Sequence, residues 1–72
     1  MDENRYLIVI ERAGDGSYSA FVPDLPGCAS CGDTVEEVKR SIREAIAFHL
    51  DGMRADGLPI PQPTCQADYV VA

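Results

Sequence analysis

Residues 23–34 have the sequence PDLPGCASCGDT, from Pro23 to Thr34. Pro23 has no amide hydrogen to donate, so it is expected to end a strand or to lie at a sheet edge. Pro26-Gly27 suits the central positions of a type II turn, because proline fixes the first φ and glycine tolerates the second. The chain then reverses into a short strand near residues 28–31, and Gly32-Asp33-Thr34 leads into a helix.

Two further strands are predicted before this stretch. Residues 6–10 (YLIVI) are continuously apolar, which is typical of a strand covered on both faces. The Asp-Gly pair within residues 13–16 is a strong hairpin signal, and residues 18–22 (YSAFV) form the next strand. Its side chains alternate between two faces, with Tyr18, Ala20 and Val22 on one face and Ser19 and Phe21 on the other.

One long helix is predicted over about residues 35–56. Thr34 and Glu37 form a capping box, in which Thr34 caps the free amides and Glu37 reaches back. Gly57 suits the C′ position, where Leu58 can fold back onto Met53, and the proline that follows prevents continuation of the helix. The apolar stripe at helical spacing comprises Val35, Val38, Ile42, Ala45, Ile46, His49 and Met53.

The remaining chain predicts an extended return arm at residues 58–63 (LPIPQP) and a last strand at residues 67–71 (ADYVV). The predicted order is β-β-β-α-β. This is an α+β fold, a small antiparallel sheet with one long helix on one face, in a single domain over residues 1–72. Because the first strand is apolar on both faces, we expect the second sheet face to meet another subunit or a partner.

The small size of the chain also favours association. A domain of 72 residues buries only about 60% of the surface of its unfolded chain. Small folds gain the missing stability from disulfides, metals or partner subunits. We therefore expect a homo-oligomer, either a dimer or a tetramer.

The net charge is −6, from 12 acidic and 6 basic residues. No segment is a basic stripe, which argues against direct binding to nucleic acid. The acidic first half suits a basic protein partner, although solubility alone also explains it. No apolar run is long enough for a secretory signal or a membrane span, so a cytoplasmic protein is expected, without membrane association.

The Cys28-x-x-Cys31 pair raises the alternatives of metal binding, redox activity and simple packing. On a strand, positions i and i+3 point to opposite faces about 10 Å apart, which is too far for a disulfide. A zinc site needs about four ligands, and only Cys65 and His49 remain as candidates. Packing of small thiols is therefore favoured, and neither a metal nor another cofactor is expected.

The sequence offers little support for catalysis. His49 belongs to the apolar helix stripe and has no evident acid or nucleophile beside it. No phosphate loop, Ser/His/Asp set or dedicated carboxylate pair is present, so we expect no enzyme. Phe48 lies about 110° from the centre of the stripe, which suggests either simple exposure or an oligomer contact.

Several of these motifs closely resemble the HicB-like antitoxin family. The resemblance extends from Tyr6 to about Pro63, and chance agreement of its blocks at this spacing is improbable. It rests on the runs YSAFVPDLPGC at residues 18–28, GDTVEE at residues 32–37, EAI at residues 44–46 and GLPIP at residues 57–61.

The resemblance implies a domain like a truncated ribonuclease H fold that lacks that fold's catalytic acidic cluster. Family members are typically antitoxins that block HicA, a small basic toxin that cleaves messenger RNA. Many also carry a C-terminal DNA-binding domain, for which this chain has no room after Ala72. We therefore expect a short single-domain member that does not bind DNA directly.

The leading hypothesis is a non-enzymatic HicB-like antitoxin that binds and neutralises a HicA-type toxin. Its candidate partner-binding residues come from the acidic hairpin and the following loop, with Phe48 as the candidate oligomer contact. They are Glu11, Asp15, Tyr18, Phe21, Asp24 and Leu25. The alternatives are an orphan oligomeric regulator or scaffold without a toxin and, more remotely, a Cys/His metal-binding protein.

Overall fold

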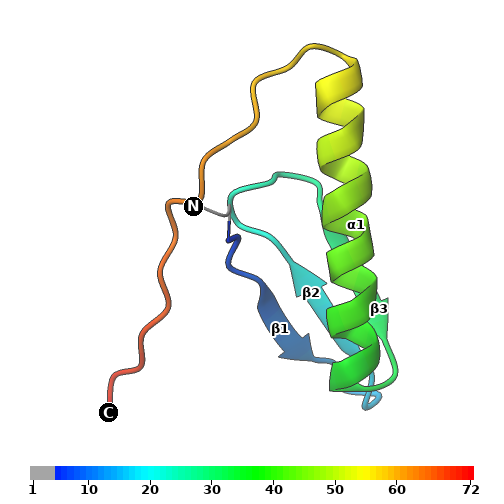
Figure 1. Cartoon of the computed structure of the whole chain (residues 1–72). Coiled ribbons are helices and arrows are strands. Elements are labelled where there is room, and N and C mark those ends of the chain that lie inside the picture. The colour runs from blue at the N-terminus through cyan, green and yellow to red at the C-terminus, as the bar shows by residue number, and fades with distance from the viewer. Residues whose placement is uncertain (1–4) are drawn as a thin grey trace.

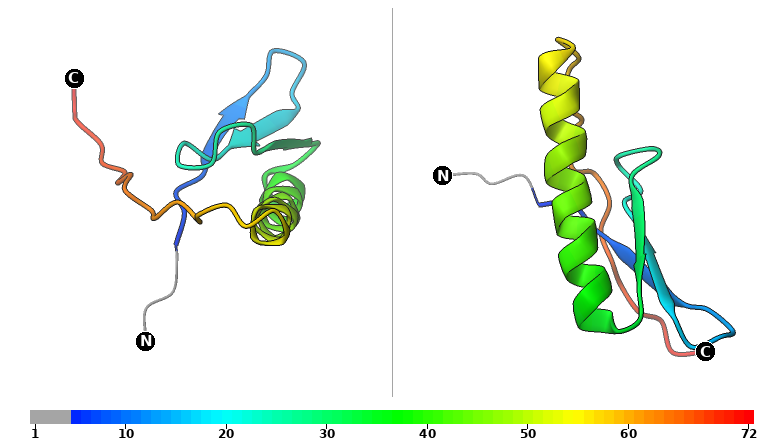
Figure 2. Two further views of the ribbon diagram at one scale, coloured as in Figure 1. Left: turned by 90° about the horizontal axis from the view of Figure 1, so that it is seen from above. Right: turned by 90° about the vertical axis from the view of Figure 1, so that its right-hand side faces the viewer.

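The computed structural model describes residues 5–72 and shows a three-stranded antiparallel sheet with one long helix packed on one face (Figures 1 and 2). The strands lie in the order β1-β2-β3 within the sheet. The element bounds are β1 Val9–Arg12, β2 Tyr18–Phe21, β3 Ala29–Gly32 and α1 Val35–Ala55. The predicted α+β class and the order of the first four elements are therefore confirmed.

Both predicted turns are present. In the β1–β2 turn, Gly16 has a φ of 90° and the Ala13 amide donates to the Ser17 carbonyl over 2.8 Å. In the β2–β3 turn, Gly27 has a φ of 85° and the Cys28 amide donates to the Leu25 carbonyl over 3.0 Å. A positive φ at the second central residue and this hydrogen bond define the type II turn.

The first strand begins later than the sequence predicted, at Val9 instead of Tyr6. Val9 pairs with Phe21, so continuation of the same register would place Leu7 opposite Pro23. Proline cannot donate to a sheet ladder, which explains why pairing stops before that point. At its other end β1 extends to Arg12, which pairs with Tyr18.

The core lies between the sheet and α1. Ala20 and Val22 face it and are 2% exposed, whereas Ser19 is exposed and Phe21 is 41% exposed, as the alternation of β2 predicted. The buried residues are Ala20, Val22, Leu25, Cys28, Val38, Ile42 and Leu50. Leu50 was missing from the predicted stripe, although it lies four residues after Ile46 and so shares that face.

Helix α1 is capped at both ends. The Glu37 amide donates to Thr34 Oγ1 over 3.1 Å, and the Glu37 carboxylate accepts from the Asp33 amide over 3.0 Å. At the C-terminal end Gly57 has a φ of 72°, and the Leu58 amide donates to the Met53 carbonyl over 2.9 Å. In residues 5–72 no helix combines the length and the apolar character that a membrane crossing requires.

An extended arm, residues 58–66, runs from the end of α1 across the molecule. Ile60 packs against the core, and the Tyr6 hydroxyl donates to the Pro61 carbonyl. The Asp24 carboxylate accepts hydrogen bonds from Thr64 and Cys65, so it fixes the far end of the arm beside the β2–β3 turn.

The prediction of a last strand at residues 67–71 is wrong for the single chain. Residues 67–72, here called the tail, contain no strand and point away from the sheet and the helix (Figures 1 and 2). Tyr69, Val70 and Val71 are 95%, 91% and 97% exposed. A strand needs a neighbour that satisfies its backbone groups, and the arm does not bring the tail against β1.

Candidate protein-binding surface

The face of the sheet opposite α1, here called the outer face, is open to solvent. The register places Val9, Phe21 and Ala29 side by side across the three strands. The next row on this face contains Glu11, Ser19 and Cys31. Because side chains alternate along each strand, these two rows face away from the core. The outer face therefore combines a partly exposed aromatic ring with an acidic side chain.

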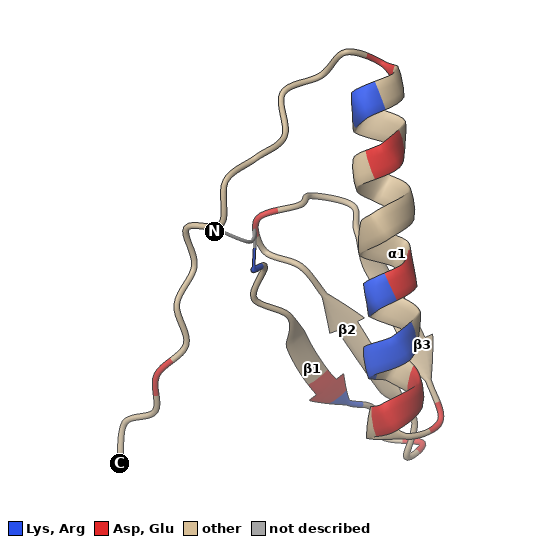
Figure 3. Cartoon of the chain, viewed as in Figure 1, with Lys and Arg blue, Asp and Glu red and all other residues tan. Residues whose placement is uncertain are grey.

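Acidic residues also gather at one end of the molecule, here called the acidic end (Figure 3). The end of β1, the start of β2 and the end of β3 meet there because the strands are antiparallel, and α1 begins directly afterwards. The acidic end comprises Glu11, Asp15, Asp33, Glu36 and Glu37, and it also contains the basic residue Arg12 at the end of β1. Such a concentration of negative charge attracts a basic protein surface.

Asp15 is held in a defined position within the acidic end. Its carboxylate accepts hydrogen bonds from the Ser17 hydroxyl over 2.7 Å and from the Ser17 amide over 2.9 Å. The hydroxyl hydrogen bond, followed by the amide hydrogen bond, lowers the pKa of Asp15 below its usual value of 3.8. Asp15 therefore carries its full negative charge at neutral pH.

The six candidate partner-binding residues do not form one surface. Glu11, Asp15 and Phe21 lie on the outer face or the acidic end. Tyr18 is on the opposite face of β2, where it is half-buried against the core. Leu25 is fully buried, so its inclusion among surface residues is corrected: it anchors the β2–β3 turn in the core.

Asp24 has a contact within the chain that the sequence did not reveal. Its carboxylate accepts from Thr64 Oγ1 at 2.8 Å, from the Thr64 amide at 3.0 Å and from the Cys65 amide at 3.3 Å. The Thr64 hydroxyl hydrogen bond makes the largest contribution to lowering the pKa of Asp24. The partners are 40 and 41 residues away in sequence, so no local motif indicates this contact.

The cysteines are free thiols in different environments. Cys28 is 5% exposed, and its burial raises the pKa of the thiol. The pKa of Cys65 is also raised, chiefly by its hydrogen bond to Asp24. Cys28 is thus a packing residue, as predicted, whereas Cys31 lies exposed on the outer face. Within the described range, 5–72, no three His, Cys, Asp or Glu residues are grouped as metal ligands.

The two remaining candidates lie next to each other on α1. His49 is half-buried, whereas Phe48 is 82% exposed. Exposure makes Phe48 available for contact with another molecule, and its assignment as an oligomer contact stays a prediction.

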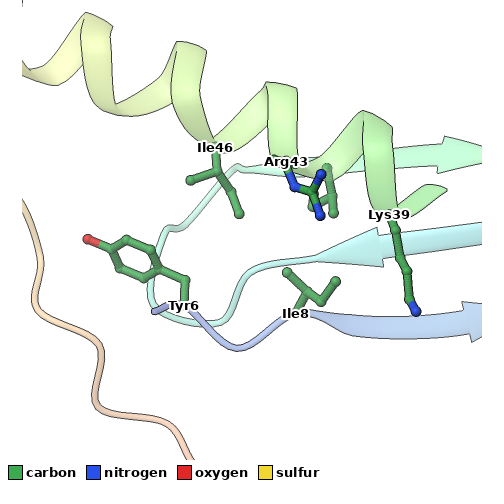
Figure 4. Close-up of a pocket in the computed structure, with 6 residues that line it drawn as sticks. Tyr6, Ile8, Lys39, Arg43 and Ile46 are labelled. Atoms are coloured by element: carbon green, nitrogen blue, oxygen red, sulfur yellow. The ribbon is translucent and has the colours of Figure 1, made fainter. Parts of the chain in front are cut away.

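A groove between α1 and the segment leading into β1 was not predicted. It has a volume of about 490 Å³, and Figure 4 shows side chains from the helix and from the segment leading into β1 pointing toward each other across it. We call it the β1–α1 groove. Its lining comprises Tyr6, Ile8, Lys39, Ile42, Arg43 and Ile46. Lys39 and Arg43 are the two basic residues in an otherwise apolar lining. The groove forms only when the helix packs beside the segment leading into β1, and sequence periodicity does not specify that packing.

Comparison with known proteins places this geometry among bacterial toxin–antitoxin components. Residues 6–72 match the model of the "HicB_like antitoxin of bacterial toxin-antitoxin system" family. The N-terminal domain of antitoxin HicB from Burkholderia pseudomallei superposes with a TM-score of 0.71 at 30% identity. That similarity covers 83% of this chain and 69% of the solved chain.

Curated relatives include proteins of different lengths. A 14.9 kDa protein of Haemophilus phage HP1 is 43% identical over 90% of this chain, which spans only 48% of the phage protein. A UPF0150 protein of Synechocystis is 42% identical, with coverage of 79% of this chain and 72% of the relative. Antitoxin HicB 1 of Photorhabdus laumondii is 34% identical over 92% of this chain and 43% of its own length.

Proposed function

The chain belongs to the family of HicB-like antitoxins of bacterial toxin–antitoxin systems, and from this premise we propose that it binds and neutralises a HicA-type toxin. The observation that carries the proposal is the family match over residues 6–72. The structural similarity to the N-terminal domain of a HicB antitoxin supports it. In this role the chain acts in the cytoplasm as a non-enzymatic binding module that masks the toxin.

The acidic end and the outer face are the proposed contact surface for the toxin. A protein that holds messenger RNA needs basic side chains to neutralise phosphates. The acids of the acidic end complement such a surface, with Glu11 and Asp15 exposed at the hairpin. Phe21 adds an apolar anchor on the outer face, since aromatic residues are enriched at protein interfaces. Neutralisation then follows from occupation of the surface that would bind RNA.

The test is co-expression with the product of a small basic reading frame beside this gene. We expect a stoichiometric complex in size-exclusion chromatography with light scattering, together with relief of growth inhibition. The double variant Glu11→Lys/Asp15→Lys should weaken the complex at least tenfold, because like charges would then face each other. Glu44→Lys/Asp56→Lys makes the same charge change on α1 and just after it, away from the acidic end, and serves as the matched control.

The outcomes separate the proposal from its alternative. A complex that survives the Glu11/Asp15 reversal with unchanged affinity would reject the acidic end as the contact surface. A homo-oligomer that ignores the neighbouring protein would reject the antitoxin role and favour an orphan oligomeric regulator.

A further inference from the structure

The tail presents an apolar segment that the chain itself does not cover. Tyr69, Val70 and Val71 are consecutive and each is more than nine-tenths exposed. Aromatic and β-branched residues of this kind favour an extended, half-buried strand. Contiguous exposed apolar side chains are typical of interaction sites. The tail therefore has the composition of a segment that binds in an extended form.

The β1–α1 groove offers a surface of matching character. Its Tyr6, Ile8, Ile42 and Ile46 side chains are apolar, and it lies beside β1, an edge strand of the sheet. In the described part of the chain, β1 has β2 as its neighbour on one side and no strand on the other. A free edge of this kind can accept an extended segment through backbone hydrogen bonds.

The charges of the two surfaces are complementary. Lys39 and Arg43 line the groove, and neither takes part in the one ion pair found within residues 5–72, which joins Arg54 to Asp51. Asp68 is the one charged residue in the segment from Gly57 to Ala72. An extended tail directs Asp68 and Val70 to the same side, so the carboxylate can face the cations while the valine contacts the isoleucines.

The chain's own tail is held away from this groove. Asp24 fixes Thr64 and Cys65 beside the β2–β3 turn, and the residues after Gln66 point outward (Figure 2). A second hollow of about 530 Å³ separates the base of the tail from the segment leading into β1. It is lined by residues 5–8 together with Cys65 and Gln66. An outward tail beside an unfilled groove is the arrangement that favours exchange between identical copies.

We propose that the tail of one copy lies extended in the β1–α1 groove of a second copy, and that the exchange is reciprocal. The tail pairs its backbone with the free edge of β1 and sets Asp68 against Lys39 and Arg43 of the second copy. Tyr69 and Val71 then extend the outer face beside Leu7 and Val9. This self-association does not depend on a toxin, so its failure and the failure of the antitoxin role are separately observable.

The first experiment is a charge-exchange series on the full chain, followed by sedimentation and light scattering. Wild type should have twice the 7.8 kDa chain mass. Lys39→Glu and Asp68→Lys should each weaken dimerisation about tenfold, because a reciprocal exchange contains every contact twice. The double variant Lys39→Glu/Asp68→Lys should recover most of the lost dimer affinity, because opposite charges again face each other. Arg40→Glu, which makes the same charge change outside the groove lining, should leave dimerisation unchanged.

The second experiment identifies which copy supplies the tail. Isotope-filtered NMR on mixed labelled and unlabelled chains should give contacts between Val70 of one copy and Ile42 or Ile46 of the other. Tyr69 and Val71 should instead contact Leu7 and Val9 of the other copy. Contacts found within one copy alone, or a monomer with a mobile tail, would overturn the proposal. A dimer that tolerates both single charge variants would overturn it as well.

Discussion

At the scale of the residue, Gly32 shows how closely β3 approaches the first turn of α1. A Cβ added there would lie 2.8 Å from the Val38 backbone nitrogen and 3.0 Å from Glu37 Cβ. The backbone nitrogen cannot move aside without displacing the helix. The absence of a side chain at Gly32 is therefore a packing requirement. The sequence did not reveal it, because it depends on the distance between two elements.

We expect Gly32→Ala to lower the free energy of unfolding by about 1–3 kcal/mol, since it overpacks this contact. Urea denaturation followed by circular dichroism measures the change. Gly52→Ala is the matched control: Gly52 is inside α1, and an added Cβ meets nothing within 4 Å. The control should stabilise the chain by up to about 1 kcal/mol through helix propensity. Equal effects of the two changes would contradict the packing argument.

Asp24 is a second residue whose role comes from distant contacts. We expect Asp24→Asn to release the arm, because the amide replaces a charged acceptor of several hydrogen bonds with a weaker one. Amide hydrogen exchange at Thr64 and Cys65 should accelerate. Asp56→Asn, whose side chain makes none of these hydrogen bonds, should leave exchange at both amides unchanged. Unchanged exchange in Asp24→Asn would show that the carboxylate does not hold the arm.

The same contact predicts a pH dependence with a definite sign. The folded-state pKa of Asp24 lies below the usual 3.8, chiefly because of the Thr64 hydroxyl. Its contribution to stability is complete above the unfolded-state pKa and is lost as the pH falls through the folded-state pKa. The arm should therefore remain attached at neutral pH and detach in acid below about pH 4. NMR titration of the Thr64 amide would detect this, and detachment between pH 6 and 8 would contradict it.

At the scale of the element, α1 depends on the cap that Thr34 provides. We expect Thr34→Ala to lower the free energy of unfolding by about 1 kcal/mol, because the Glu37 amide loses its acceptor. Thr34→Ser keeps the hydroxyl and should restore nearly all of the loss. Thermal denaturation of the three proteins compares them directly. A serine variant as unstable as the alanine variant would argue against the hydrogen bond.

The elements that the sequence predicted well are those encoded within a few adjacent residues. The Pro26-Gly27 turn, the Thr34 cap and the Gly57 exit depend on local backbone preferences and are all confirmed. The predicted start of β1 was wrong, because the point where pairing stops depends on which residue of β2 lies opposite each residue of β1. The last strand was wrong for a related reason: residues 67–71 have strand composition but no neighbour in the isolated chain.

At the scale of the whole molecule, the exposed Phe21 and Phe48 lie on different elements and serve different predictions. Phe21 is on the outer face of β2, and Phe48 projects from α1. Phe21→Ser should weaken the toxin complex at least tenfold, because it removes the aromatic anchor. The free energy of unfolding should change by less than about 0.5 kcal/mol, as for other substitutions on a protein surface. Toxin affinity equal to wild type would remove Phe21 from the contact surface.

Phe48→Ser provides the reciprocal comparison. The proposed tail exchange does not involve Phe48, so a mass below that of wild type, with toxin affinity unchanged, would show a second oligomer contact on the helix. An unchanged mass would exclude Phe48 from the oligomer interface. Together the two variants assign the exposed aromatic residues to separate surfaces.

The candidate site was predictable only in part. Composition and hairpin position placed Glu11, Asp15 and Phe21 on the surface, since alternation along a strand is readable from sequence. The list failed for Leu25, because burial is a property of the assembled chain. The contact of Asp24 with the arm could not be predicted for the same reason, and its role in partner binding stays a prediction. The β1–α1 groove was not predicted for the same reason, since its lining comes from α1 and from the segment before β1.

The arm has a consequence for how the chain is degraded. It crosses the molecule with few attachments, chiefly Ile60, the Tyr6–Pro61 hydrogen bond and the Asp24 contacts. Segments of this kind open without global unfolding and are the first to enter a protease active site. A single cut after Gln66 would remove the apolar tail and leave the strands and the helix folded. Under the proposed exchange, a chain cut there could still accept the tail of another copy in its β1–α1 groove, but it would have no tail to donate.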